Sequence, residues 1–234
     1  MQIQIKPLTS IKLATLATGA ALLLIIAIQN AQAGVEQAPK QDPNIVAVQE
    51  RVRQIVSHSF PSLKGVPIRI KTFKNGEYFF KSRPGIKRLF GKRKGYRIFF
   101  SPEVFNDEIP DAALTGVLAH EISHLADYKS RNIFSIISLL PKISNIQTNA
   151  LFERGIDMDA ISKGYSKELI EYRLWIYERL SEDALEKKQI EYLTPDEILI
   201  LSNLFDSNPE LYRRLRKRPP RSLDELNDRI QGWF

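Results

Sequence analysis

The residues with the clearest chemical potential are two histidines and a glutamate within LTGVLAHEISHLADY (114–128). His120 and His124 are four residues apart, and Glu121 directly follows the first histidine. On an α-helix, residues at positions i and i+4 lie on one face, so both imidazoles can point at one metal ion. Glu121 lies on a neighbouring part of that face and can reach a water molecule on the ion. This HExxH pattern is typical of zinc peptidases. The alternative is a helix that carries two histidines toward solvent or a polar pocket.

Two histidines do not complete such a site, because catalytic zinc has three protein ligands and keeps a fourth position for water. The chain contains no cysteine and only one other histidine, His58, near the end of a predicted helix. We expect His58 to be a surface residue. A carboxylate on a later helix is therefore the expected third ligand. Glu153 and Asp157, four apart in LFERGIDMDAI (151–161), offer one ligand and one partner for the outer N–H of a histidine. The alternative is an exposed acidic pair on an amphipathic helix.

HExxH followed by ExxxD on a downstream helix resembles the gluzincin metallopeptidases, of which thermolysin is a member. The likeness is greater to the HtpX and CAAX-prenyl-protease type and to the minigluzincins, and it covers about residues 95–160. The multiple transmembrane helices of the HtpX type are absent from the sequence, which favours a small exported enzyme.

This resemblance implies one Zn²⁺ per chain, with His120, His124 and Glu153 as ligands and Asp157 in support. It implies hydrolysis of peptide bonds in a peptide or protein substrate, with Glu121 as the general base. By the same resemblance, the strand expected at 96–100 could receive the substrate as an added strand. A second oxyanion donor is also expected, and the sequence does not choose among Tyr128, Tyr165, Tyr172, Arg173 and His58.

The first 33 residues have the pattern of a secretory signal peptide. Lys6 and Lys12 precede an uncharged apolar run at 13–28, and Ala31 and Ala33 form a small-x-small cleavage site. We expect export to the periplasm or the extracellular space. The alternative is an anchor retained in the membrane through 13–28. Residues 34–44 are predicted to be a linker.

The formal net charge is +7, and eight basic residues without an acidic one lie in the loop at 81–97. Because the protein is expected to be exported, nucleic acid is not an expected partner. The loop is either a solvated segment or a peripheral contact for an anionic membrane or a cell-wall polymer.

The remaining pattern predicts an α+β fold that is predominantly helical, with a small, roughly three-stranded sheet packed on the HExxH helix. A first helix is expected at 45–58, and the HExxH helix at 110–128. Two strands around Asn75-Gly76 are expected to form a hairpin, since Asn-Gly favours tight turns. The apolar segment 132–146 contains Pro141 and is read as a buried or lid-forming helical turn, or as a segment that dips into a membrane.

From Thr148 onward the pattern is helical, with capping boxes predicted at TPDE (194–197) and SLDE (222–225). We divide the chain into a peptidase domain at 45–190 and a helical C-terminal extension at 191–234 packed on the same domain. Two rival functions remain open. One is a metal-binding module without proteolytic activity, and the other is a basic protein that binds a membrane or cell-wall surface.

Overall fold

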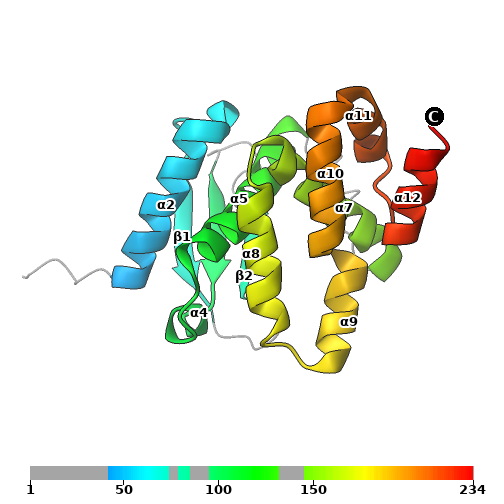
Figure 1. Cartoon of the computed structure of the whole chain (residues 1–234). Helices are drawn as coiled ribbons and strands as arrows, with labels where there is room; N and C mark the ends of the chain where they lie inside the picture. The colour runs from blue at the N-terminus through cyan, green and yellow to red at the C-terminus, as the bar shows by residue number, and fades with distance from the viewer. Residues whose placement is uncertain (1–41, 74–78, 85–94, 132–144, 234) are drawn as a thin grey trace, which may run out of the picture. The chain divides into compact units, whose positions relative to one another are not determined.

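The structure is a computed structural model that describes residues 42–73, 79–84, 95–131 and 145–233. Residues 43–234 form one compact unit, which is predominantly helical with a small three-stranded mixed sheet (Figure 1). The predicted α+β class is thus confirmed. The expected signal peptide lies outside the described residues, and so do Asn75-Gly76 and nearly all of the apolar segment 132–146. In the part that is described, no helix is long and apolar enough to cross a membrane.

The sheet has the order β1-β3-β2, with β1 at Ile68–Thr72, β2 at Phe80–Pro84 and β3 at Tyr96–Phe100. Strand β3 pairs in parallel with β1 and antiparallel with β2. The hairpin predicted around Asn75-Gly76 is therefore wrong, because β1 and β2 lie on opposite sides of β3. The physical reason is burial. β3 buries three residues of its inner face, and the central position gives these residues neighbours on both sides.

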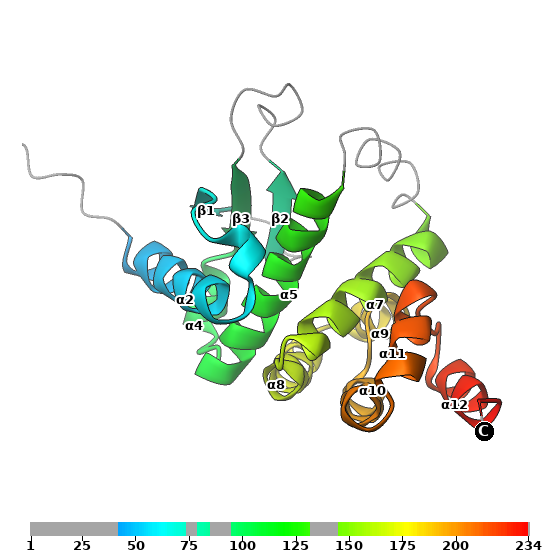
Figure 2. The same cartoon turned by 90° about the horizontal axis from the view of Figure 1, so that it is seen from above.

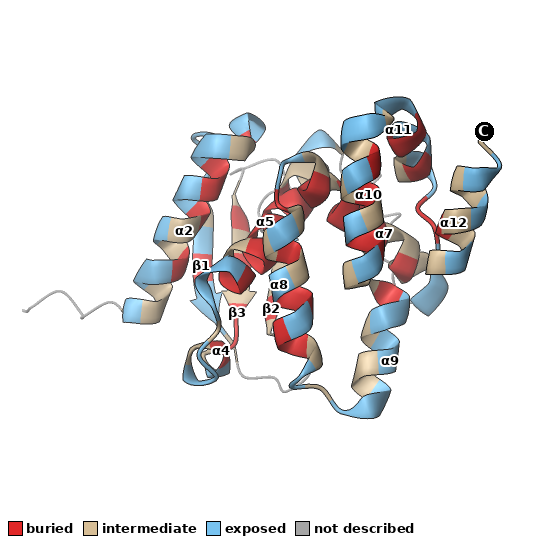
Figure 3. Cartoon of the chain, in the orientation of Figure 1, coloured by how far each residue is buried: buried red, intermediate tan, exposed pale blue. Residues whose placement is uncertain are grey.

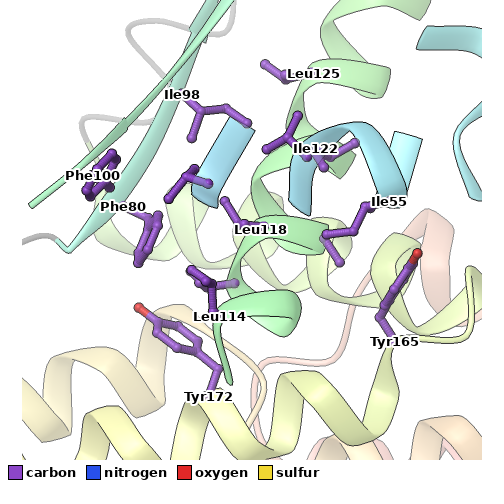
Figure 4. Close-up of a cluster of buried hydrophobic side chains, with 14 of the residues drawn as sticks. Ile55, Phe80, Ile98, Phe100, Leu114, Leu118, Ile122, Leu125, Tyr165 and Tyr172 are labelled. Atoms are coloured by element: carbon purple, nitrogen blue, oxygen red, sulfur yellow. The ribbon is translucent and has the colours of Figure 1, made fainter. Parts of the chain in front are cut away.

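The inner face of the sheet packs on helices α2 (Pro43–Ser59) and α5 (Asp111–Ser130). Ile98 and Phe100 of β3, with Phe80 of β2, meet Leu118 and Ile122 of α5 in one hydrophobic cluster (Figure 4). Both helices were predicted from the sequence, and their observed ends lie within two residues of the predicted ones. The sheet therefore holds one side of the HExxH helix against the core.

Helix α5 is buried along nearly its whole length, from Ala113 to Leu125. It lies between the sheet and the helices α7 (Ile146–Ser162) and α8 (Ser166–Tyr177), as Figure 2 shows. A helix that is apolar on all sides is typical of a core position. Here the imidazoles and the carboxylate of the HExxH motif are the polar exceptions, and they must find partners inside the protein.

The remaining elements are short or lie in the C-terminal half of the chain. They are η1 (Pro61–Leu63), α4 (Glu103–Asn106), α9 (Glu182–Glu191), α10 (Pro195–Ser207), α11 (Pro209–Lys217) and α12 (Leu223–Gln231). The capping box of Thr194 and Glu197 is confirmed at the start of α10. Ser222 caps α12 as predicted, but the Glu225 carboxylate accepts from the backbone N–H of Arg221 instead of closing the box on Ser222.

Helices α7, α10, α11 and α12 share a second hydrophobic cluster around Met158 and Leu201. Figure 3 shows buried positions on each of these helices. The Arg154 side chain of α7 is fully buried beside this cluster and pairs with Glu197. It also donates to the carbonyl oxygens of Tyr192 (2.8 Å) and Pro220 (2.5 Å). These bonds satisfy a buried guanidinium and attach the C-terminal segments to α7.

We predict that Gly116→Ala destabilises the protein by about 1–3 kcal/mol or more, the range for overpacked cores. Gly116 lies one turn before His120, where α5 crosses α8. A Cβ there would overlap the backbone of Glu168 and lie 2.7 Å from the backbone nitrogen of Leu169. Denaturant unfolding measures the change. Gly155→Ala is the matched control, since its Cβ would meet the movable end of the Arg216 side chain. An equal loss in both variants would contradict the backbone clash.

Candidate metal centre

Helix α5 presents His120, Glu121 and His124 toward helix α7, which presents Glu153 and Asp157. The first three residues are nearly enclosed, with relative exposures of 5%, 6% and 6% for the whole residue. Asp157 is completely buried, and the Glu153 side chain is 13% exposed. Each helix therefore contributes residues four apart on the face toward its partner. The structure brings together all five residues that the sequence singled out for the site.

Three atoms converge at the centre of this group. The Nε2 atoms of His120 and His124 are 3.1 Å apart, and Glu153 Oε2 lies 3.2 Å from the first and 3.1 Å from the second. One proton can bridge only one of these pairs at a time, whereas one cation can be bound by all three atoms. Ligand atoms on a tetrahedral zinc ion with bonds of about 2.0–2.1 Å lie about 3.3–3.4 Å apart. The residues present therefore fit a metal ion, and His120, His124 and Glu153 form a group that could hold one.

Asp157 fixes the orientation of one of these imidazoles. Its Oδ1 lies 2.7 Å from Nδ1 of His120, which donates the hydrogen bond because the carboxylate can only accept. The same carboxylate accepts from Arg173 at 2.8 and 2.9 Å and from the backbone N–H of Leu193 at 2.9 Å. With its proton on Nδ1, neutral His120 turns the lone pair of Nε2 toward the convergence point.

The electrostatics of the group concentrate negative charge beside the imidazoles. Burial would lower the pKa of His120, but the charge of Asp157 and the hydrogen bonds that His120 donates to Asp157 and Glu153 outweigh it and raise that pKa to about 9. Burial would raise the pKa of Glu153, but the neighbouring His124 and His120 hold it well below its usual range. Burial would also raise the pKa of Asp157, but the charge of Arg173 and then that of His120 lower it. Both carboxylates are therefore ionised at neutral pH and favour a bound cation.

Glu121 has a different environment from the other carboxylates. Its Oε2 is buried and has no hydrogen-bond partner within the described ranges. The side chain borders a cavity of about 400 Å³ that also exposes His120, His124 and Glu153. A buried carboxylate oxygen without a partner is costly unless a ligand satisfies it. Its position beside the convergence point suits a group that accepts a proton from water.

Two walls of the cavity come from strand β2 and from the end of helix α9. Residues Phe80–Arg83 of β2 line one wall, and Glu191 and Tyr192 line another. Since β3 is the central strand, the expected role of residues 96–100 as the edge that receives a substrate is wrong: both edges of β3 are already paired. The strand edge beside the cavity belongs to β2.

The five candidates for a second oxyanion donor fall into different places. Tyr128 borders the cavity, and its ring stacks on His124 with centroids 5.9 Å apart. Tyr172 lines a smaller cavity of about 30 Å³ beside Glu121. Arg173 is held by Asp157 and by the carbonyl oxygen of Leu193, so its guanidinium supports the site from behind.

The other two candidates lie away from His120, His124 and Glu153, which we call the metal group. The Tyr165 hydroxyl is hydrogen-bonded to Ser59 at 2.9 Å, and its ring packs on Phe60. His58 is an exposed residue in the last turn of α2, as expected from the sequence. Tyr165 and His58 are therefore not placed to contact a substrate at the metal group.

Tyr192 is a site residue that the sequence analysis did not identify. Its ring lies 5.7 Å from that of His120, with the guanidinium of Arg173 4.7 Å and the ammonium of Lys188 4.5 Å from its centroid. The capping box at 194–197 indicates that a turn comes directly after Tyr192. That signal locates the end of a helix but says nothing about the groups that the turn faces.

Comparisons with protein-family models, with curated proteins and with solved structures found no match to the chain. The interpretation of the site therefore depends on its own geometry.

We predict that Glu153→Ala loses zinc affinity severely, because two imidazoles alone leave the ion without its third protein ligand. Asp157→Asn should weaken zinc binding by about 10- to 100-fold, since the amide no longer fixes His120 as the carboxylate does. Competition with a chelator measures both affinities, and circular dichroism verifies that each variant is folded. Asp159→Asn is the matched control: Asp159 is on the same helix but pairs with Arg216. Loss of zinc from Asp157→Asn with retention in Glu153→Ala would reverse the two roles.

Proposed function

We propose that the chain is a zinc-dependent metallopeptidase that hydrolyses peptide bonds. The observation that carries the proposal is the combination of three convergent ligand atoms with an unpartnered, buried Glu121 carboxylate in one cavity. A purely structural metal site uses four protein ligands and has no need of a free base beside them. Here three protein ligands leave a position for water, and the base lies next to it. The resemblance to gluzincins supports the same function.

The donor set favours zinc among the common divalent ions. Two imidazole nitrogens and one carboxylate oxygen match the His₂Glu sets of catalytic zinc sites, whereas magnesium and calcium prefer oxygen ligands alone. When bound, zinc supplies two things: it lowers the pKa of a bound water toward about 7, and it polarises a carbonyl oxygen.

The remaining steps belong to side chains of this protein. Glu121 accepts the proton of the attacking water and delivers it to the leaving nitrogen. Arg173 and Asp157 hold His120 in the required tautomer while charge develops. Burial raises the pKa of Tyr128 and of Tyr192, so both phenols remain protonated over the physiological range. Because both border the cavity, either hydroxyl can donate to the developing oxyanion.

The edge of β2 offers a means of binding an extended peptide. Its outer edge is not paired with β3, and its residues Phe80–Arg83 line the cavity with the metal group. An extended substrate that adds as a strand would form main-chain hydrogen bonds there, which are independent of side-chain identity. The proposed substrates are therefore peptides or unfolded protein segments.

We also propose that the protein is exported and that its signal peptide is removed near Gly34. The evidence is in the sequence: a weakly basic start, the apolar run 13–28 and the Ala31-x-Ala33 cleavage pattern. Mass spectrometry of the exported protein should give an N-terminus at or close to Gly34. Recovery of the intact Met1 terminus in the membrane fraction would instead indicate the anchored form.

Glu121→Gln tests the proposed catalytic role. The amide preserves the shape of the side chain but cannot accept a proton, so the variant should retain stoichiometric zinc while its hydrolysis of casein falls at least 10²-fold. Glu191→Gln is a matched control, because Glu191 is a carboxylate that borders the same cavity without contacting the ligand atoms. Zinc binding by the unmodified chain with no cleavage of any unfolded protein would favour a non-proteolytic metal-binding module.

A further inference from the structure

The outer face of the sheet carries a dense group of cations. Side chains alternate along each strand, and the inner set of β3 is buried while Arg97 and Phe99 point outward. The residues in register with them on β1 and β2 share that outer face. We call this surface the cationic sheet face; its residues are Arg69, Lys71, Lys81, Arg83, Arg97 and Phe99.

The register arranges these residues in two parallel rows. Arg69 of β1, Arg97 of β3 and Arg83 of β2 stand directly beside one another across the sheet. Two residues along each strand, Phe99 lies between Lys71 and Lys81. Because neighbouring strands are about 4.8 Å apart, the three arginines start from backbone positions that span only about 10 Å. Five positive charges therefore surround one aromatic ring on a small area.

This arrangement is unfavourable for the isolated sheet, because like charges directly opposite one another destabilise a strand pair. None of the three strands contains an acidic residue, and among the described residues no carboxylate forms an ion pair with Arg69, Arg83 or Arg97. Lys81 lies over the Phe73 ring at 3.9 Å from its centroid. By contrast, the exposed Arg213 on α11 pairs with Glu210 at 2.9 Å. Within the described residues, the three arginines of the sheet face therefore have no carboxylate that offsets their repulsion.

We propose that the cationic sheet face binds the surface of an anionic lipid bilayer. The charges lie in two dimensions on one face of a sheet, which matches a plane of headgroups. A nucleic acid strand is usually bound in a basic groove that follows its backbone. A partly buried aromatic residue at the centre of the cations is also typical of surfaces that insert into the headgroup boundary. The segment 81–97 was predicted to be a basic loop, but the structure places Lys81 and Arg83 in strand β2 and Arg97 in strand β3.

The location of the face relates the bilayer to the metal group. Lys81 and Arg83 belong to β2, whose residues also line the 400 Å³ cavity. A protein bound through this face has its cavity next to the membrane surface. The binding itself requires neither zinc nor hydrolysis, so it is independent of the proposed peptidase function.

Vesicle co-sedimentation of the full chain tests the proposal. Binding is measured to phosphatidylcholine vesicles and to vesicles in which about one lipid in three is phosphatidylglycerol. Binding to the neutral vesicles measures how much the apolar run 13–28 contributes without any anionic lipid. Binding should be stronger to the anionic vesicles, and the gain should disappear in about 1 M salt, where the screening length is about 3 Å.

The variant Arg69→Gln/Arg83→Gln/Arg97→Gln should lose roughly 100-fold of the gain on anionic vesicles, since each cation near such a surface contributes about 1 kcal/mol, or about fivefold. Its matched control replaces three exposed cations on other elements, Arg213, Lys217 and Arg221, with glutamine, and it should retain the gain. If the triple variant does not fold, Arg69→Gln/Lys71→Gln on the edge strand β1 should lose roughly 25-fold.

Equal losses in the sheet-face variant and its control would overturn the proposal, because only net charge would then matter. So would unchanged binding of the sheet-face variant. Binding to soluble polyphosphate with the same dependence on the three arginines, without any gain on anionic vesicles, would assign the face to a phosphate polymer instead.

Discussion

The fully buried Asp157 carboxylate is the interaction on which the rest of the site depends. It accepts hydrogen bonds from His120 on α5, Arg173 on α8 and the backbone N–H of Leu193, so it connects three helices and the segment before α10. A buried carboxylate is stable only if each of its lone pairs has a donor. The packing of α5 against α8 at Gly116 brings Arg173 within reach. The orientation of the His120 imidazole thus follows from contacts made far from its own helix.

Helix α7 has charged residues on two faces, and each face has a separate task. Glu153 and Asp157 point to α5 and contact its histidines, whereas Arg154 and Asp159 point to the C-terminal segments, where they meet Glu197 and Arg216. The first face lies opposite α5, which belongs to the hydrophobic cluster around the sheet, and α7 itself contributes Met158 to the second cluster. Because one rigid helix carries both sets, the C-terminal segments help to hold Glu153 at its position opposite the histidines.

The parts of the structure that could be predicted from the sequence are those decided by contacts along one helix. The four-residue spacing of His120 and His124, and that of Glu153 and Asp157, places each pair on one face whatever the tertiary fold. The capping residues Thr194 and Ser222 act within three residues of their own position, and both were recognised. The strand order could not be predicted in this way. The Asn75-Gly76 signal acts locally, whereas the competition of two strands for a place beside β3 involves residues far apart in the sequence. The role of Arg173 was also beyond prediction, since its partner depends on how α8 crosses α5.

The network around Asp157 has a consequence for the order in which the protein assembles. The ligand atoms come from residues 120 to 153, but the groups that orient them extend to Leu193, and the carbonyl that receives Arg154 belongs to Pro220. During synthesis, the chain therefore carries both histidines long before the amide and guanidinium that hold Asp157 have emerged. Such non-local contacts form late in folding, because the intervening loops must close first. The groups that orient His120 and Asp157 are therefore complete only after the chain has been made as far as Leu193.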